Sequence, residues 1–167
     1  MTNSSNLIDS LEVYVLNNPD DVKPHWVSHF IVPTANELLI KIKNKNGNSG
    51  FGLATSYSDI SPIIKPFSNG LQDFIIGQDP FCPEKIYESI SKLTDTRISS
   101  EKGWNKEALI RISAALDIAC WDLMGKSSNI PLYKLFGGYR NKIPVYVTCG
   151  YYRDGKTETE LREELKK

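Results

Sequence analysis

Hydrophobic and polar residues alternate in the first third of the chain, and this alternation predicts an antiparallel sheet. Residues 7–16 (LIDSLEVYVL) are rich in β-forming residues, and residues 37–43 (ELLIKIK) place their even-numbered apolar side chains on one face. A turn cluster at residues 44–50 precedes a return strand over residues 51–57, as in a hairpin. Residues 17–30 hold two prolines among polar and aromatic residues and predict a long loop. We therefore predict a three-stranded antiparallel sheet.

The spacing of apolar residues becomes helical after residue 57. Two short helices, limited by proline and glycine, are predicted before residue 82. Pro83 opens a predicted helix over residues 83–93. The longest predicted helix covers residues 104–126, and a short one follows over residues 131–138. A sheet followed by a group of helices predicts an α+β domain.

The last part of the chain has a different order of elements. Residues 143–150 (IPVYVTCG) predict a buried strand, and residues 157–167 predict a helix whose first residues, TETE, form a capping box. A strand followed by a helix is typical of the start of a βα series. We therefore place a domain boundary between residues 1–140 and residues 141–167.

The longest predicted helix is apolar nearly all round, with only four polar residues between residues 109 and 124. A helix of this kind is buried on more than one side, and the predicted sheet supplies one of the two walls. Asp117 and Asp122 point about 140° apart on this helix, so they do not form a paired catalytic or metal site. Ion pairing on the helix surface, for example of Asp122 with Lys126, is the simpler interpretation.

The composition of the chain indicates which classes of binding partner and which cellular compartment to expect. The 167 residues are 40% hydrophobic, and 20 basic residues balance 20 acidic ones, which favours neither nucleic acid nor an anionic membrane. No apolar run approaches the roughly 20 residues of a membrane helix, and the first residues do not resemble a secretory signal. Cys82, Cys120 and Cys149 are odd in number and widely spaced, so we expect no disulfide framework and a cytoplasmic protein.

Three stretches together resemble one family: SAALDIACWDLMGKSSNIPLYKLFGG, FIIGQDP before a helix begun by Pro-Glu, and IPVYVTCGYY. Over nearly its whole length the chain resembles mandelate racemases and muconate lactonising enzymes of the enolase superfamily. The resemblance implies an enolase-like N-terminal capping domain over residues 1–140. Residues 141–167 would then be the first strand and helix of a TIM-type (β/α) barrel. Since such a barrel takes about 250 residues, we expect a truncated barrel and a fragment of a longer enzyme.

The resemblance also implies a reaction. The family abstracts a proton α to a carboxylate, and Mg²⁺ stabilises the resulting enediolate. Acid-sugar dehydration or racemisation is the expected outcome, and epimerisation and cycloisomerisation remain open. The base and the metal ligands of the family stand on later barrel strands, which this sequence lacks. We therefore assign no catalytic base and no metal ligand to this chain, and we expect it to be inactive alone. For the complete enzyme we expect a small carboxylate substrate and a homo-oligomer.

The loop after the first strand corresponds to a flap that closes over the active site in this family. The resemblance makes His25, Trp26 and His29 candidates for substrate contact. Tyr57, after the hairpin, and Tyr151, after the first barrel strand, are further candidates. The alternative is an ordinary polar loop with Trp26 packed into the cap.

Two other patterns invite a catalytic interpretation that we reject. Lys41 and Lys43 form a Lys-x-Lys, but they belong to the predicted sheet of the cap and are better explained as a solvated strand face. His25 and His29 are four residues apart, yet no cysteine or acidic cluster nearby completes a zinc site.

A non-catalytic function is the alternative to an enzyme fragment. The cap could fold alone, and could bind itself or a partner through the surface that a barrel would cover. An exposed apolar face on the longest helix would have to be covered in either case.

Overall fold

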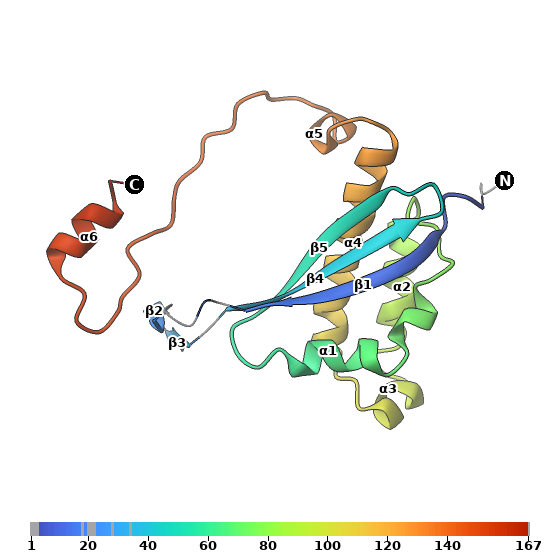
Figure 1. Cartoon of the computed structure of the whole chain (residues 1–167), viewed down its shortest axis with the longest axis horizontal. Coiled ribbons are helices and arrows are strands. Elements are labelled where there is room, and N and C mark those ends of the chain that lie inside the picture. The colour runs from blue at the N-terminus through green and yellow to red at the C-terminus, as the bar shows by residue number, and fades with distance from the viewer. Residues whose placement is uncertain (1–3, 18, 20–22, 28, 34, 167) are drawn as a thin grey trace.

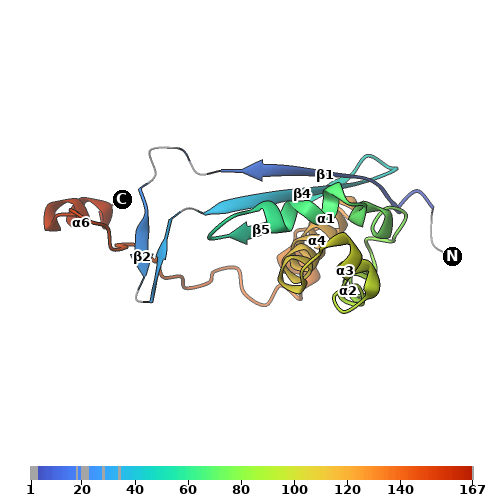
Figure 2. The same ribbon diagram turned by 90° about the horizontal axis from the view of Figure 1, so that it is seen from below.

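The computed structural model describes residues 4–17, 19, 23–27, 29–33 and 35–166. A sheet forms one layer and the first four α-helices lie against one side of it, which confirms the predicted α+β class (Figure 2). The predicted three-stranded antiparallel sheet is also confirmed. Its strands stand in the order β1 (Ile8–Leu16), β4 (Asn36–Asn44), β5 (Ser49–Ser56).

The helices largely follow the predicted order (Figure 1). Among the described residues, no helix combines the length and the apolar character needed to cross a membrane. The prediction missed one helix, α3, which begins at the Thr96 N-cap, where the threonine side chain accepts the N–H of Ser99. The bounds are α1 (Ser61–Ser68), the 3₁₀ helix η1 (Leu71–Phe74), α2 (Pro83–Ser91), α3 (Arg97–Lys102), α4 (Lys106–Ser127).

Helix α4 packs directly on the sheet and forms the centre of the core. The alternation in β4 buries Leu38, Ile40 and Ile42 completely on the face that α4 covers. On β5 the corresponding positions are small, because Gly50 and Gly52 lie against the backbone of the helix. A Cβ built on Gly52 would lie 1.9 Å from the Ala115 carbonyl oxygen. The close approach of helix and strand therefore requires glycine at these positions.

Two charged side chains of α4 reach the free edge of β5. The Asp122 carboxylate accepts the backbone N–H of Phe51 at 2.9 Å, and the Arg111 guanidinium donates to the carbonyl of Thr55. The predicted ion pair of Asp122 with Lys126 is confirmed. Because an unpaired strand edge is open to pairing with other chains, these contacts also protect the edge of the sheet.

The chain after α4 leaves the two-layered body. Helix α5 (Leu132–Leu135) ends near Gly137, and the following segment runs back along the molecule to its opposite end (Figure 1). The buried strand predicted over residues 143–150 is wrong. Among the described residues this segment pairs with no strand, and Val145 and Tyr146 are 84% and 90% exposed. An apolar run forms a buried strand only where neighbouring strands and a covering layer are present.

The helix predicted after this segment is confirmed as α6 (Glu158–Glu164). Its capping box is present: the Thr157 hydroxyl accepts the N–H of Glu160, and the Glu160 carboxylate accepts the N–H of Thr157 at 2.8 Å. The domain boundary at residue 140 stays a prediction.

Candidate functional site

A short β-hairpin lies beyond one end of the main sheet and overlaps the segment of residues 17–30, for which we predicted a loop. Strand β2 (His25–Val27) pairs with β3 (Phe30–Val32), and His25 stands opposite Val32. Both strands project away from the two-layered body (Figure 2). The prediction of a long loop over residues 17–30 is therefore wrong for β2 and for Phe30, the first residue of β3. Each strand has only three residues, which is too short for a periodic pattern to reveal.

The hairpin is joined to a segment more than a hundred residues later. The N–H of Trp26 donates to the carbonyl of Tyr152 at 2.9 Å, and the N–H of Tyr152 donates to the carbonyl of Trp26 at 3.3 Å. These two bonds form an antiparallel bridge. The residues that follow the apolar 143–150 segment thus hold the hairpin by its backbone.

Three of the five residues proposed for substrate contact come together here. The rings of His25 and Tyr151 lie 4.8 Å apart at 44°, and Trp26 borders a pocket of about 230 Å³. Tyr151 also lines this pocket, together with Tyr152 and Leu161. His25 contacts the pocket only through the Tyr151 ring. A phenol hydroxyl beside an apolar wall suits a small polar ligand, because it supplies a hydrogen bond in a partly desolvated site.

The other two proposed residues lie elsewhere. His29 lies in the turn of the hairpin and is exposed. The Tyr57 ring faces the Phe30 ring at a centroid distance of 6.4 Å, and both side chains are 52% exposed. The two residues therefore occupy the outer part of the hairpin region.

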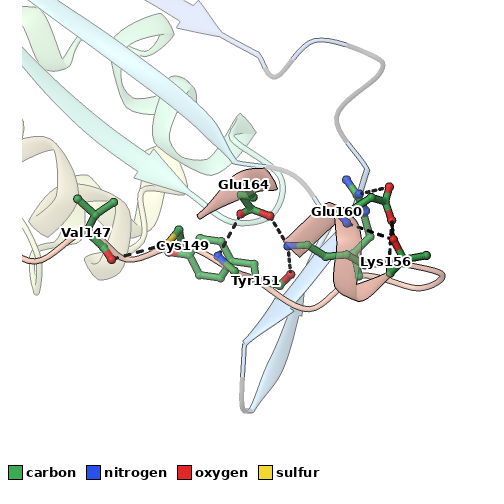
Figure 3. Close-up of polar contacts among 9 residues, drawn as sticks. Val147, Cys149, Tyr151, Lys156, Glu160 and Glu164 are labelled. Atoms are coloured by element: carbon green, nitrogen blue, oxygen red, sulfur yellow. Dashed lines mark hydrogen bonds and ion pairs between the residues drawn. The ribbon is translucent and has the colours of Figure 1, made fainter. Parts of the chain in front are cut away.

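A network of polar contacts underlies the pocket (Figure 3). The Lys156 ammonium donates to the Tyr151 carbonyl at 3.0 Å and forms an ion pair with Glu164. The other carboxylate oxygen of Glu164 accepts the N–H of Gly150 at 3.0 Å. Arg153 pairs with Glu160 at 3.4 Å. Sequence reasoning missed these residues because no local motif marks contacts between a loop and the helix that follows it.

The network sets the ionisation of its acids. The hydrogen bonds from Lys156 and from the Gly150 N–H lower the pKa of Glu164, because they favour the carboxylate form. The backbone and hydroxyl of Thr157 lower the pKa of Glu160 in the same way. Both acids are therefore charged at neutral pH. Their negative charges balance the positive charges of Arg153 and Lys156 beside the pocket.

The described residues do not provide a metal centre. No group of three or more histidine, cysteine, aspartate or glutamate side chains in this part of the chain is arranged to hold a metal ion. The two lysines of the rejected Lys-x-Lys lie on the outer face of the sheet, where Lys41 forms an ion pair with Glu12 at 3.0 Å. The residues present therefore do not fit Mg²⁺ binding.

A second surface of interest is the side of α4 turned away from the sheet. Ile110 and Ile118 are 48% and 52% exposed there, and Ala114 between them is exposed as well. The Trp121 ring continues this row and contacts Phe136 at a centroid distance of 4.8 Å. The row is a continuous apolar face along the helix, of the kind that another surface covers.

Asp117 lies beside this face. Burial raises the pKa of its carboxyl, the nearby Glu84 raises it further, and a hydrogen bond with Trp121 opposes both effects. The residue is half-buried and does not form a site with Asp122.

Comparison with known proteins gives one consistent family. The family model for the mandelate racemase / muconate lactonizing enzyme N-terminal domain matches residues 10–137. The arabinonate dehydratase of Saccharolobus solfataricus is 30% identical over 127 residues, covering 76% of this chain and 32% of the relative. The hydrophobic dipeptide epimerase of Enterococcus faecalis is 29% identical over 127 residues, covering 71% of this chain and 31% of the relative.

Solved structures agree with the fold. A crystal structure of a mandelate racemase/muconate lactonizing enzyme superposes with a TM-score of 0.76 at 24% identity, covering 96% of this chain and 43% of its own. A racemase from Streptomyces coelicolor, solved with bound magnesium, superposes with a TM-score of 0.64 at 26% identity. It covers 80% of this chain and 36% of its own. The chain spans about a third of the length of the curated relatives it matches.

Proposed function

Since the chain belongs to the mandelate racemase / muconate lactonizing enzyme family and contains its N-terminal domain, we propose that it forms the cap and substrate flap of an enolase-superfamily enzyme. The flap is the β2–β3 hairpin together with Tyr151 and Tyr152. Its role is to close over a small carboxylate substrate and to select it by shape and hydrogen bonding.

The bridge between Trp26 and Tyr152 is the observation that carries this proposal. Tyr152 follows the extended segment of residues 143–150, which we propose becomes the first barrel strand once the other strands of a barrel pair with it. Active sites of (β/α) barrels lie at the carboxyl ends of their strands. A hairpin fixed to the residues just after such a strand is therefore fixed at the rim of the active site.

The chemistry of the flap follows from its side chains. The His25 imidazole and the Tyr151 hydroxyl can exchange hydrogen bonds with the hydroxyl groups of a sugar acid. Trp26 lines one side of the pocket, and closure of the flap over a substrate would exclude water there and strengthen these bonds. Relatives named as arabinonate, galactonate and gluconate dehydratases favour a sugar acid over a dipeptide as the substrate.

The reaction itself needs groups outside these residues. We assign the complete enzyme the removal of a proton α to the carboxylate, with dehydration as the outcome. We place the base and the Mg²⁺ ligands on the barrel, since the described residues contain no group of three or more histidine, cysteine, aspartate or glutamate side chains that could hold a metal ion. The exposed face of α4, from Ile110 to Ile118, is assigned to contact with that barrel, since burial of this apolar area favours docking.

A fusion protein tests the flap. Residues 1–140 of this chain would be joined to the barrel of the Saccharolobus solfataricus arabinonate dehydratase, and 2-keto acid formation would be measured with a panel of sugar acids. For a second fusion that also keeps residues 141–167 of this chain, and with them the rest of the pocket lining, we expect His25→Ala and Trp26→Ala each to lower kcat/KM about tenfold or more. Tyr57→Phe, outside the pocket, serves as the matched control. Equal kcat/KM for all variants would contradict the flap assignment.

A further inference from the structure

The network below the pocket has a feature that helix capping alone does not explain. Lys156 directly precedes the N-cap of α6 and Glu164 is the last residue of that helix, yet the two side chains meet over the loop of residues 150–152 (Figure 3). The side chain of Lys156, which precedes the Thr157 N-cap, is only 11% exposed, whereas that of Arg162 within α6 is 71% exposed. Lysine is rarely enclosed to this degree unless its ammonium group has fixed partners.

The partners of this pair are backbone groups of the loop. Lys156 donates to the Tyr151 carbonyl, and Glu164 accepts the Gly150 N–H. Gly150 has φ +78°, and a Cβ at this position would lie 3.1 Å from the Leu161 side chain. The loop is thus held from both sides at adjacent residues. The next residue along, Tyr152, is the one that bridges to the hairpin.

We propose that Lys156 and Glu164 are positioning residues that latch the 150–152 loop to α6 and thereby set where the flap docks. The latch acts through the loop: it fixes the Tyr151 ring against His25 and the Tyr152 backbone against Trp26. Without it, the loop can rotate about Gly150, and both contacts with the hairpin loosen together. The assignment of a role in the enzyme rests on the proposed function of the hairpin as a flap.

Amide hydrogen exchange in the full 167-residue chain tests the latch directly. Lys156→Met keeps the length of the side chain and removes its charge and its hydrogen bonds. We expect the Trp26 and Tyr152 amides to exchange about fivefold faster in this variant, since each latch bond contributes a modest net stabilisation. The His25 ring protons should also lose the ring-current shift that the Tyr151 ring induces.

Two further variants separate a latch from general weakening of the helix. Arg162→Met removes the exposed ion pair with Glu158 from the same helix and should leave the Trp26 and Tyr152 amides unchanged. Lys156→Arg retains a donor for both partners and should restore most of the protection. Exchange at Trp26 that is unchanged in Lys156→Met, or equally fast in Arg162→Met, would overturn the latch.

The exchange experiment is independent of catalysis. If Lys156→Met loosens both amides but Trp26→Ala leaves kcat/KM of the fusion unchanged, the latch stands and the flap function fails. If exchange is unchanged while Trp26→Ala lowers kcat/KM, the flap function stands and the latch fails.

Discussion

Replacing Gly52 with alanine should separate helix α4 from the sheet. The added Cβ would lie 1.9 Å from the Ala115 carbonyl oxygen and 2.8 Å from its carbonyl carbon. Ordinary contact begins near 3.4 Å, so the helix must retreat by about 1.5 Å (from 1.9 to 3.4 Å). Both clashing atoms are backbone, and neither can rotate away. We expect a loss of about 3 kcal/mol, at the upper end of the usual cost of overpacking.

Urea unfolding followed by circular dichroism measures this loss. With a slope of about 2 kcal/mol/M, the midpoint should fall by about 1.5 M. Gly47→Ala is the matched control, because Gly47 has φ +85° but no atom within 4 Å of the added Cβ. Its cost is conformational only, about 1 kcal/mol, and its midpoint should fall by about 0.5 M. Equal midpoints for the two variants would refute the assignment of Gly52 to close helix packing.

Three further outcomes follow from the structure. Asn105→Ala removes the side chain that accepts the Ala108 N–H at 2.7 Å, and should lower the free energy of unfolding by about 1 kcal/mol in the same assay. Iodoacetamide at pH 8 should label the exposed Cys149 first and Cys120 only after unfolding. The reason is that burial raises the pKa of the Cys120 thiol to about 12, so little reactive thiolate forms. Labelling of Cys120 in the folded protein would contradict this prediction. The α6 capping box should contribute its full stabilisation above the ordinary glutamate pKa and lose it as the pH falls through the lowered pKa of Glu160. The loss should appear as faster hydrogen exchange of the α6 amides. Slower exchange of these amides on acidification would contradict the lowered pKa of Glu160.

Elements with a long periodic pattern were predictable from the sequence. The alternation in residues 37–43 specifies β4 because this strand has a partner on each side and one buried face. The apolar character of residues 104–126 specifies α4 for the same reason: the sheet covers one side of it. For β4 the environment that the pattern requires lies within the chain, whereas for α4 the face from Ile110 to Ile118 remains exposed.

Predictions failed where the structural partners of a segment are missing or are distant in sequence. Residues 143–150 carry the pattern of a buried strand, but no strand lies beside them, so they remain extended and exposed. The hairpin at His25 was missed because its strands are short and its third partner, Tyr152, is distant in sequence. His25 and Tyr151 were proposed through a family resemblance, and the structure brings them into contact. Lys156 carries no motif and was found only from the structure.

The central claim is that this chain serves as the cap of a (β/α) barrel. Capture of the protein from the cells that make it, with an antibody against residues 106–127, followed by intact mass and peptide sequencing, tests this claim most directly. We expect the captured species to contain barrel sequence, with a Lys-x-Lys and spaced carboxylates, in the same chain or in a bound one. A species of 18.8 kDa without barrel sequence would contradict the claim and would favour a self-associating module that buries the face of α4.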